Sequence, residues 1–342
     1  MTTELDLIPS VSLRASSIVD IEDLIERFLA GDRLALAKAL TQIERGGGES
    51  EQILERVHGR AGRALRLGVT GPPGAGKSTV VSALIRHYRE AGKTVGVVAV
   101  DPSSSFTGGA LLGDRVRMQE FATDRGVFIR SMASRGRLGG LSGATLDATL
   151  LMDAFGLDIV FIETVGVGQS EIDVAEAVDT TLVVISPESG DGIQALKAGL
   201  MEVADLFVVN KSDREGADRL ERELLLTQDI LDDHSEKRQP EIVRTSAATG
   251  KGIRELIEAI ERHQEFMQRE GRLSRRRREN LARQLRAMLA ERMERLFFGS
   301  SRMRSDFEEA VGLAEAREET LHRAVGRLVQ NFFSRDSQDT SS

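Results

Sequence analysis

Residues 65–79 read LRLGVTGPPGAGKST, in which a short aliphatic run leads directly into a glycine-rich loop and a helix-favouring stretch. The loop, Gly71 to Thr79, matches the phosphate-binding pattern of Gly, any four residues, then Gly-Lys-Ser. In a strand–loop–helix unit of this kind, backbone N–H groups and the helix N-terminus bind phosphates. The stretch therefore predicts a P-loop nucleotide-binding fold.

Each residue type in this loop has a chemical reason. Gly71, Gly74 and Gly76 can adopt backbone angles that turn successive N–H groups toward phosphate oxygens. Lys77 brings a positive charge to the β- and γ-phosphates, and the Ser78 hydroxyl can bind Mg²⁺. The predicted phosphate-binding residues are Gly71, Gly74, Ala75, Gly76, Lys77, Ser78 and Thr79.

Six further runs, most of them nearly continuous in aliphatic residues, follow between Thr94 and Ser246, separated by helix-favouring stretches. They are TVGVVAV, VFIRS, DIVFIET, TTLVVIS, DLFVVN and EIVRTS. Continuous rather than alternating apolar residues are typical of parallel strands that helices bury on both faces. The order predicts an α/β fold, a doubly wound and mostly parallel sheet of the P-loop NTPase type.

The run DLFVVN ends in a second loop, Asn210-Lys211-Ser212-Asp213. A carboxylate accepts two hydrogen bonds well in bidentate geometry. Guanine offers adjacent N1–H and N2–H₂ donors and adenine does not, so Asp213 would reject ATP by leaving a charge unpaired. The Lys211 stem can lie along the base, and Asn210 can brace the loop. The nucleotide is therefore predicted to be GTP or GDP.

The next aliphatic run, EIVRTS, ends in Ser246, which Ala247 and Ala248 follow. Backbone N–H groups at this point can meet guanine O6. The predicted base-binding residues are Asn210, Lys211, Asp213, Ser246, Ala247 and Ala248.

Acidic residues at the ends of two runs predict a magnesium site. Asp101 directly follows TVGVVAV and Glu163 lies near the end of DIVFIET. Ligands of open α/β sheets lie at the carboxyl ends of strands. Mg²⁺ takes few protein carboxylates and several waters. The candidates, direct or through water, are Ser78, Asp101, Asp114 and Glu163. Gly166 suits a loop whose backbone N–H senses the γ-phosphate.

The composition excludes several classes of protein. The chain has 342 residues, with 46 Lys and Arg against 54 Asp and Glu, and no Cys. An acidic balance argues against general nucleic-acid binding, and the absence of Cys excludes disulfides and cysteine-ligated metals. No apolar run reaches the ~18 residues of a membrane span, and the N-terminus lacks a signal-peptide pattern. We expect a cytoplasmic protein without nucleic-acid or membrane partners.

The pattern predicts three zones. An N-terminal helical extension is expected over residues 1–62, with helices from Asp20 to about Gly31 and from Leu34 to Glu44. The P-loop GTPase domain is expected over 63–270. Residues 271–342 hold 15 Arg, no Lys and 11 acidic residues, and we expect a helical arm there with helices over 281–298 and 306–333. Its apolar stripe would pack on the main domain or on a second copy.

These motifs together resemble the GTPase chaperones of adenosylcobalamin-dependent acyl-CoA mutases, typified by the methylmalonyl-CoA mutase-associated GTPase, within the SIMIBI class of P-loop GTPases. Glu163, where most GTPases carry aspartate, is a mark of this subgroup. The resemblance implies that the C-terminal arm serves homodimerisation. The most specific segments are DPSSSFTGGALLGDRVRM (101–118), FIRSMASRGRLGGLS (128–142), ETVGVGQSE (163–171) and PESGDGIQALKAGLMEVAD (187–205).

The resemblance also implies a function: gating of adenosylcobalamin loading and protection or reactivation of a mutase such as methylmalonyl-CoA mutase. GTP hydrolysis would be slow and stimulated by the partner, and an adenosyltransferase is a second partner that the resemblance allows. The segment Ser186 to Gly199 matches a switch loop that signals to the mutase, with Gln194 and Lys197 at functional polar positions. The chain departs from the family at Ala198, where a second lysine is usual, and at Ala247-Ala248, where Ala-Lys is usual.

Hydrolysis needs a group that positions water and groups that neutralise charge. Gln169, three residues after Gly166, is the candidate for the water, with helix capping as its alternative role. No built-in arginine finger is assured, so slow intrinsic turnover is expected. The catalytic candidates are Lys77, Glu163, Gln169 and Lys197, and the arginines available for charge neutralisation or for structural contacts are Arg115, Arg117, Arg135 and Arg137.

Two other classes share part of this pattern. A nickel-insertion maturation GTPase for urease or hydrogenase shares the sheet and base motif, but it normally uses Cys and His ligands. This chain has no Cys and its five His residues are scattered. A kinase shares the phosphate loop, but the guanine motif and the lack of an acceptor site argue against it. The mutase chaperone is preferred, with the nickel-insertion GTPase as the alternative.

Overall fold

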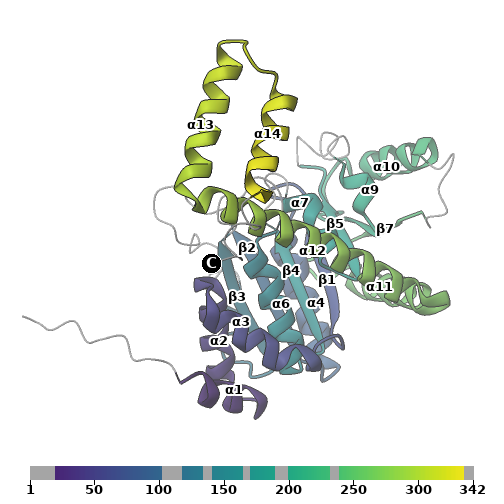
Figure 1. Cartoon of the computed structure of the whole chain (residues 1–342). Coiled ribbons are helices and arrows are strands. Elements are labelled where there is room, and N and C mark those ends of the chain that lie inside the picture. The colour runs from purple at the N-terminus through teal and green to yellow at the C-terminus, as the bar shows by residue number, and fades with distance from the viewer. Residues whose placement is uncertain are drawn as a thin grey trace, which may run out of the picture. The chain divides into compact units, whose positions relative to one another are not determined.

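Seven parallel strands form one sheet in the computed structural model, which describes residues 20–101, 118–133, 141–164, 170–188, 199–231 and 239–334 (Figure 1). Their order across the sheet is β3-β2-β4-β1-β5-β6-β7. Each aliphatic run forms one strand, so the predicted doubly wound α/β fold is confirmed. The strands are β1 (Leu65–Thr70), β2 (Val95–Asp101), β3 (Val127–Ala133), β4 (Ile159–Thr164), β5 (Thr180–Ile185), β6 (Leu206–Val209) and β7 (Glu241–Arg244).

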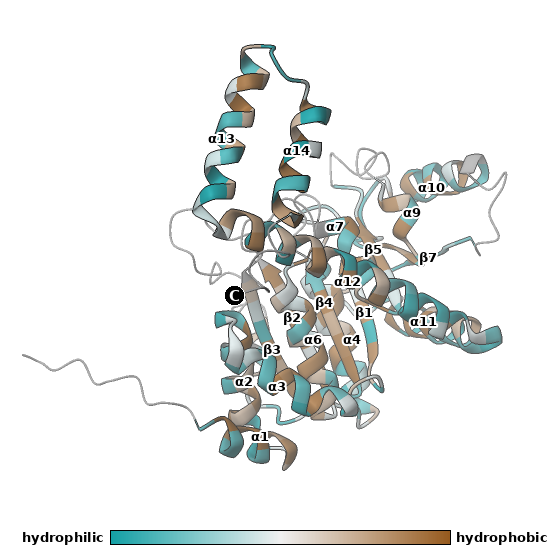
Figure 2. Ribbon diagram, viewed as in Figure 1, coloured by the Kyte–Doolittle hydropathy of each residue, from teal (hydrophilic) through white to brown (hydrophobic). Residues whose placement is uncertain are grey.

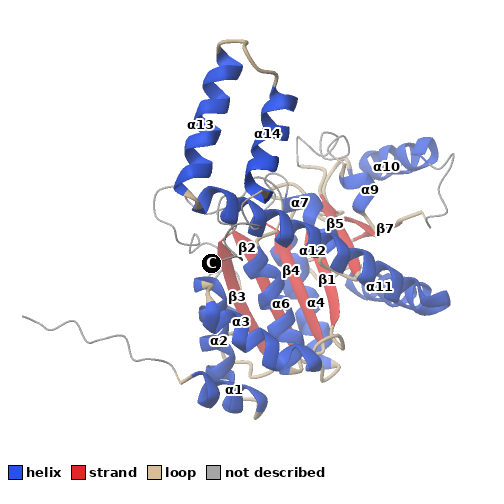
Figure 3. Ribbon diagram, in the orientation of Figure 1, coloured by secondary structure: helices blue, strands red, loops and turns tan. Residues whose placement is uncertain are grey.

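Helices connect the strands and cover both faces of the sheet (Figure 3). Those in the N-terminal part are α1 (Ile21–Leu29), α2 (Arg33–Arg45), α3 (Gly48–Val57), α4 (Lys77–Glu90) and α6 (Gly143–Phe155). Those between β4 and the arm are α7 (Ser170–Asp173), α9 (Leu200–Val203), α10 (Ala217–Leu231) and α11 (Ile253–Gln268). The arm contains α12 (Arg272–Gly299), α13 (Ser301–Glu315) and α14 (Leu321–Phe333).

Strand β5 contributes side chains to the apolar clusters on both faces of the sheet, because successive residues of a strand point to opposite faces. Leu182 and Val184 belong to the apolar cluster under α4 and α11. Val183 and Ile185 belong to the cluster on the opposite face with α9 and α10. Because successive strand residues point to opposite faces, a fully aliphatic strand fits only a sheet with helices on both sides.

The N-terminal part contains three helices where two were expected. Gly46 and Gly47 have positive φ of 72° and 94°, and they end α2 as the sequence predicts. The next residue, Gly48, already begins α3, whose Ile53 and Val57 are buried against the other helices. The glycines that end the second expected helix therefore separate it from a third helix.

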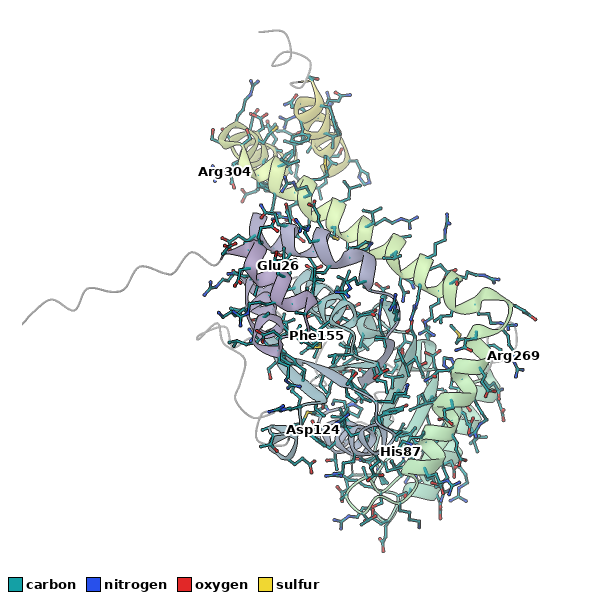
Figure 4. The ribbon with its side chains drawn as sticks, turned by 90° about the horizontal axis from the view of Figure 1, so that it is seen from below. Glu26, His87, Asp124, Phe155, Arg269 and Arg304 are labelled. Carbon is teal, nitrogen blue, oxygen red and sulfur yellow. The ribbon has the colours of Figure 1, made fainter. Side chains whose placement is uncertain are left out.

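Asp153 of α6 fixes the chain where it enters the sheet. Its buried carboxylate accepts hydrogen bonds from the backbone N–H groups of Gly62 (2.8 Å), Arg63 (3.0 Å) and Ala64 (3.0 Å). Nearby, the ring of Phe155, labelled in Figure 4, meets Phe28 of α1 edge-on at 5.3 Å. These contacts position β1, and with it the phosphate loop that follows.

The chain divides into two compact units, Met1–Arg272 and Leu273–Ser342. In the second unit, α12 ends at Gly299 as expected, but the helix expected over 306–333 is two helices. Arg317 takes a φ of +61° after α13, and the Thr320 side chain then caps α14. No helix among the described residues is both long and apolar enough to cross a membrane.

Many apolar side chains of the arm are exposed in the single chain, and Figure 2 shows the mixture of apolar and polar residues along α13 and α14. The small internal cluster of this unit consists of Ala310, Ala324 and Leu328 with Phe297 packed against it. On α12, the exposed fractions of Leu281, Leu285, Met288 and Leu289 lie between 59% and 68%. The other helices of the second unit therefore leave this apolar stripe uncovered.

Candidate functional site

The glycine-rich loop joins β1 to α4 at the carboxyl end of the sheet. Gly71 and Gly76 have φ of 130° and 91°, which L side chains rarely adopt. A Cβ atom on Gly71 would lie 2.0 Å from the Val184 carbonyl oxygen, and one on Gly76 would lie 2.4 Å from Asn210 Nδ2. Both positions therefore require glycine, because the loop packs tightly against β5 and the Asn210 loop.

Lys77 is the first residue of α4 and its side chain is buried. Its Nζ donates to the carbonyl oxygens of Gly71 (2.7 Å) and Pro72 (3.0 Å) within the loop. Of the other loop residues, Ala75 is buried and Thr79 is exposed. The ammonium is therefore held among neutral carbonyl groups that phosphate oxygens can replace as stronger acceptors.

Ser78 of α4 and Glu163 of β4 are in contact. The Ser78 hydroxyl donates to Glu163 Oε1 at 2.5 Å, and both residues are buried. Asp101 ends β2, the neighbour of β4, one residue beyond the pairing of Val100 with Thr164. The Ser78 hydroxyl of α4 and the Glu163 carboxylate near the end of β4 form an oxygen donor set that fits Mg²⁺.

Asn210 links the two nucleotide-binding loops. Its Nδ2 donates to the Ala75 carbonyl at 2.9 Å, and its Oδ1 accepts from Thr245 Oγ1 and from the Ala247 N–H, both at 3.1 Å. All three contacts are buried. One amide group thus connects the phosphate loop, the loop after β6 and the loop after β7.

Asp213, in the loop after β6, and Ser246, in the loop after β7, contact each other. The Ser246 hydroxyl donates to Asp213 Oδ1 at 2.7 Å, and this bond is the main reason that the pKa of Asp213 lies below its ordinary value. Ala248 is exposed, and Lys211 adopts a positive φ of 55°. Asp213 is therefore ionised at neutral pH, as an acceptor for guanine N–H groups must be.

Several predicted residues lie outside the described part of the chain. These are Asp114, Gly166, Gln169, Gln194, Lys197, Ala198 and the four arginines Arg115, Arg117, Arg135 and Arg137. The described residues bring Ser78 together with Glu163, Asn210 with Ala247, and Asp213 with Ser246. The roles of the others remain predictions.

Glu171 was not singled out in the sequence, although it closes the quoted segment ETVGVGQSE. Its carbonyl oxygen accepts from Thr70 Oγ1 at 3.0 Å, and Thr164 Oγ1 donates to Thr70 Oγ1 at 3.1 Å. Burial raises the pKa of its carboxyl, and the Lys77 ammonium partly offsets this rise. The threonines that end β1 and β4 therefore hold the backbone of Glu171, whose carboxyl interacts electrostatically with Lys77.

Comparisons with known proteins show the family of this chain. The sequence model of the family described as "Methylmalonyl Co-A mutase-associated GTPase MeaB" matches residues 36–302. The chain is 46% identical over 317 residues to a Pyrococcus horikoshii relative named as a GTPase, covering 92% of this chain and 99% of that protein. It is 38% identical over 271 residues to the mouse mitochondrial methylmalonic aciduria type A homolog, covering 74% and 65%.

A solved structure has the same fold. The crystal structure described as a LAO/AO transport system kinase superposes with a TM-score of 0.72 at 29% identity, covering 92% of this chain and 98% of that one. The agreement extends over nearly the whole chain, so the P-loop fold is supported independently of the motifs.

Proposed function

This chain belongs to the methylmalonyl-CoA mutase-associated GTPase family, and from that premise we propose that it gates adenosylcobalamin loading of a cobalamin-dependent acyl-CoA mutase and protects or reactivates that enzyme. The chain itself is a GTPase, as its family and relatives are. The observation that carries the proposal is a guanine-type loop joined to a phosphate loop through Asn210, in a chain of a mutase-associated family. That the protein serves a mutase, and which mutase this is, both belong to the proposal.

The contacts of the loops support the following roles in the GTPase reaction. Lys77, now on the Gly71 and Pro72 carbonyls, would transfer its N–H donors to the β- and γ-phosphates. Backbone N–H groups of the loop and the N-terminus of α4 would hold the remaining phosphate oxygens. Asp213 and Ser246 would hold the base. Positioning of this kind, rather than covalent chemistry, is the main contribution of a protein to phosphoryl transfer.

Mg²⁺ fits beside this phosphate site. The Ser78 hydroxyl and the Glu163 carboxylate would hold it, with Asp101 and Asp114 as further candidates, directly or through water. When bound, the ion would neutralise charge on the phosphate oxygens. Ser78 would then exchange its hydrogen bond to Glu163 for the metal.

Substitution of Lys197 tests whether signalling to the mutase can be lost while intrinsic GTP hydrolysis is kept. Lys197 lies in the segment 186–199 proposed to signal to the mutase, so its catalytic role is expected only in the reaction that the mutase stimulates. Lys197→Ala should therefore leave the intrinsic GTP hydrolysis rate within about twofold. Stimulation by the mutase should fall about fivefold or more, since coupling between sites is commonly of this size. The measurement is phosphate release with and without the cognate mutase, identified by pull-down from the native organism.

Lys93→Ala is the matched control for this experiment. Lys93 lies before β2, at the amino end of the sheet, and pairs with Asp158 at 3.7 Å. Its loss should change neither rate. Equal stimulation of the Lys197 variant and the wild type would contradict the proposed signalling role.

We further propose that residues 1–62, 63–270 and 271–342 act as helical extension, GTPase domain and dimerisation arm. The exposed stripe of Leu281, Leu285, Met288 and Leu289 supports a second copy as its cover, because so large an exposed apolar surface is uncommon on a monomer. We expect light scattering to give the mass of a dimer for the whole chain. A chain truncated after Glu270, or the full chain with Leu285→Glu and Leu289→Glu, should give the mass of a monomer. An unchanged dimer in both variants would contradict this.

A further inference from the structure

Glu188 lies beside the guanine-type loop because two neighbouring strands end together. Ile185 is the last residue of β5 and pairs with Val209, the last residue of β6. The Asn210 N–H donates to the Ile185 carbonyl at 2.8 Å, so the two chains leave the sheet side by side. Three residues past β5, Glu188 therefore reaches the loop that follows β6.

The Glu188 carboxylate contacts two cations of that loop, one with each oxygen. Its Oε2 accepts from Lys211 Nζ at 2.7 Å, and its Oε1 lies 3.3 Å from Arg214 Nε. The bond with Lys211 is the largest cause of a pKa for Glu188 below its ordinary value, so the carboxylate is charged at neutral pH. These side chains are all partly exposed.

Arg214 is shared between Glu188 and Asp213. Its Nε lies 3.3 Å from Glu188 Oε1 and 3.6 Å from Asp213 Oδ2. Ser246 already donates to the other oxygen, Asp213 Oδ1. A guanine base that donates two N–H groups to Asp213 must therefore compete with the Arg214 guanidinium for the outer side of this carboxylate.

We propose that Glu188 is a positioning residue for guanine recognition, which holds Arg214 away from Asp213 and keeps that carboxylate available to the base. This inference rests on the proposed guanine site at Asp213. Without the Glu188 charge, Asp213 is the remaining carboxylate in contact with the Arg214 guanidinium among the described residues, and the guanidinium closes onto it. Guanine then has to displace an arginine in order to bind.

The loop backbone has its own supports, so a change at Glu188 acts on side-chain charge rather than on folding. The Ser212 N–H donates to the Thr245 carbonyl, and the Arg214 N–H donates to the Lys211 carbonyl, both at 2.9 Å. Neither bond involves Glu188. The nucleotide-free melting temperature of Glu188→Gln should accordingly equal that of the wild type.

The test is a double-mutant cycle on GDP affinity in the full-length protein. At low ionic strength, Glu188→Gln should raise the Kd for GDP about threefold to fivefold, the range expected of a partly exposed ion pair. Arg214→Ala alone should change the Kd less than about twofold, and in its background the effect of Glu188→Gln should also fall below about twofold. At 0.5 M salt the Glu188→Gln effect should largely vanish, because exposed charges are screened.

Glu215→Gln is the matched control, since it removes the same charge from an exposed residue of the same loop. It should leave GDP affinity unchanged. An unaltered Kd in Glu188→Gln, or an equal effect of that change with and without Arg214, would overturn the proposal. The proposed guanine site fails separately: if Asp213→Asn keeps full GDP affinity, the base site itself is wrong, whereas loss in Asp213→Asn with no effect of Glu188→Gln removes only the role of Glu188.

Discussion

Lys77→Ala should abolish tight GDP binding while leaving the fold intact. In the nucleotide-free chain the ammonium donates to the carbonyl oxygens of Gly71 and Pro72, which are neutral acceptors. Phosphate oxygens are charged acceptors, and a hydrogen bond to a charged group is worth about 1.5–3 kcal/mol. Loss of two such bonds predicts a GDP affinity lower by about 10²-fold to 10⁴-fold. Calorimetric titration with GDP measures it.

The melting temperature of the nucleotide-free variant separates lost binding from lost folding. The loop carbonyls of Gly71 and Pro72 that accept from Lys77 can turn to water, so the melting temperature should stay close to that of the wild type. Lys93→Ala is the control, because that lysine lies at the opposite end of the strands and pairs with Asp158. Near-wild-type affinity in Lys77→Ala would mean that residues 71–79 do not bind phosphate as described.

The sheet was predictable because its strands carry a strong signal. Strands buried on both faces must be apolar at nearly every position, so DIVFIET or TTLVVIS stands out against the polar helices around it. The observed strands end within two residues of the predicted runs in most cases, as β4 and β5 do. The phosphate loop was predictable for a different reason: Gly71 and Gly76 are fixed by steric contact with Val184 and Asn210, and that constraint is visible as a motif.

The helices outside the sheet were less predictable. Gly48 begins α3 in spite of two preceding glycines, because Ile53 and Val57 gain burial in the N-terminal helical core. In the arm, α13 and α14 read as one helix since residues 316–320 include neither Gly nor Pro. The break between the two helices depends on a positive φ at Arg317, and the residue type at this position does not predict it.

The charged environment of the base site could not be deduced from the motif. Asn210 and Asp213 are motif residues, but Glu188 lies 22 positions before Asn210 and approaches it only because β5 and β6 are neighbours. The sequence does not state the order of strands in a sheet. Contacts that depend on that order, such as Glu188 with Lys211, therefore require the structure.

Asp213→Asn should change which base the protein binds. In the wild type the carboxylate would accept both N1–H and N2–H₂ of guanine, whereas an asparagine amide turns one acceptor into a donor. Guanine then meets a mismatched donor, and the GDP affinity should fall about 10²-fold. Xanthine carries a carbonyl at position 2 and accepts from that amide, so xanthosine diphosphate should become the better ligand. Titration of the variant with both nucleotides measures this exchange.

The loop should survive this substitution, because the Ser246 hydroxyl can still donate to the asparagine side-chain oxygen as it now donates to Asp213 Oδ1 at 2.7 Å. Asp218→Asn is the control for lost charge: Asp218 is exposed on α10, pairs with Arg244, and should leave GDP affinity unchanged. A gain for xanthosine diphosphate distinguishes base recognition from general damage, since damage weakens both nucleotides. Unchanged GDP affinity in Asp213→Asn would reduce residues 210–213 to a surface turn, and the preference for guanine would need another explanation.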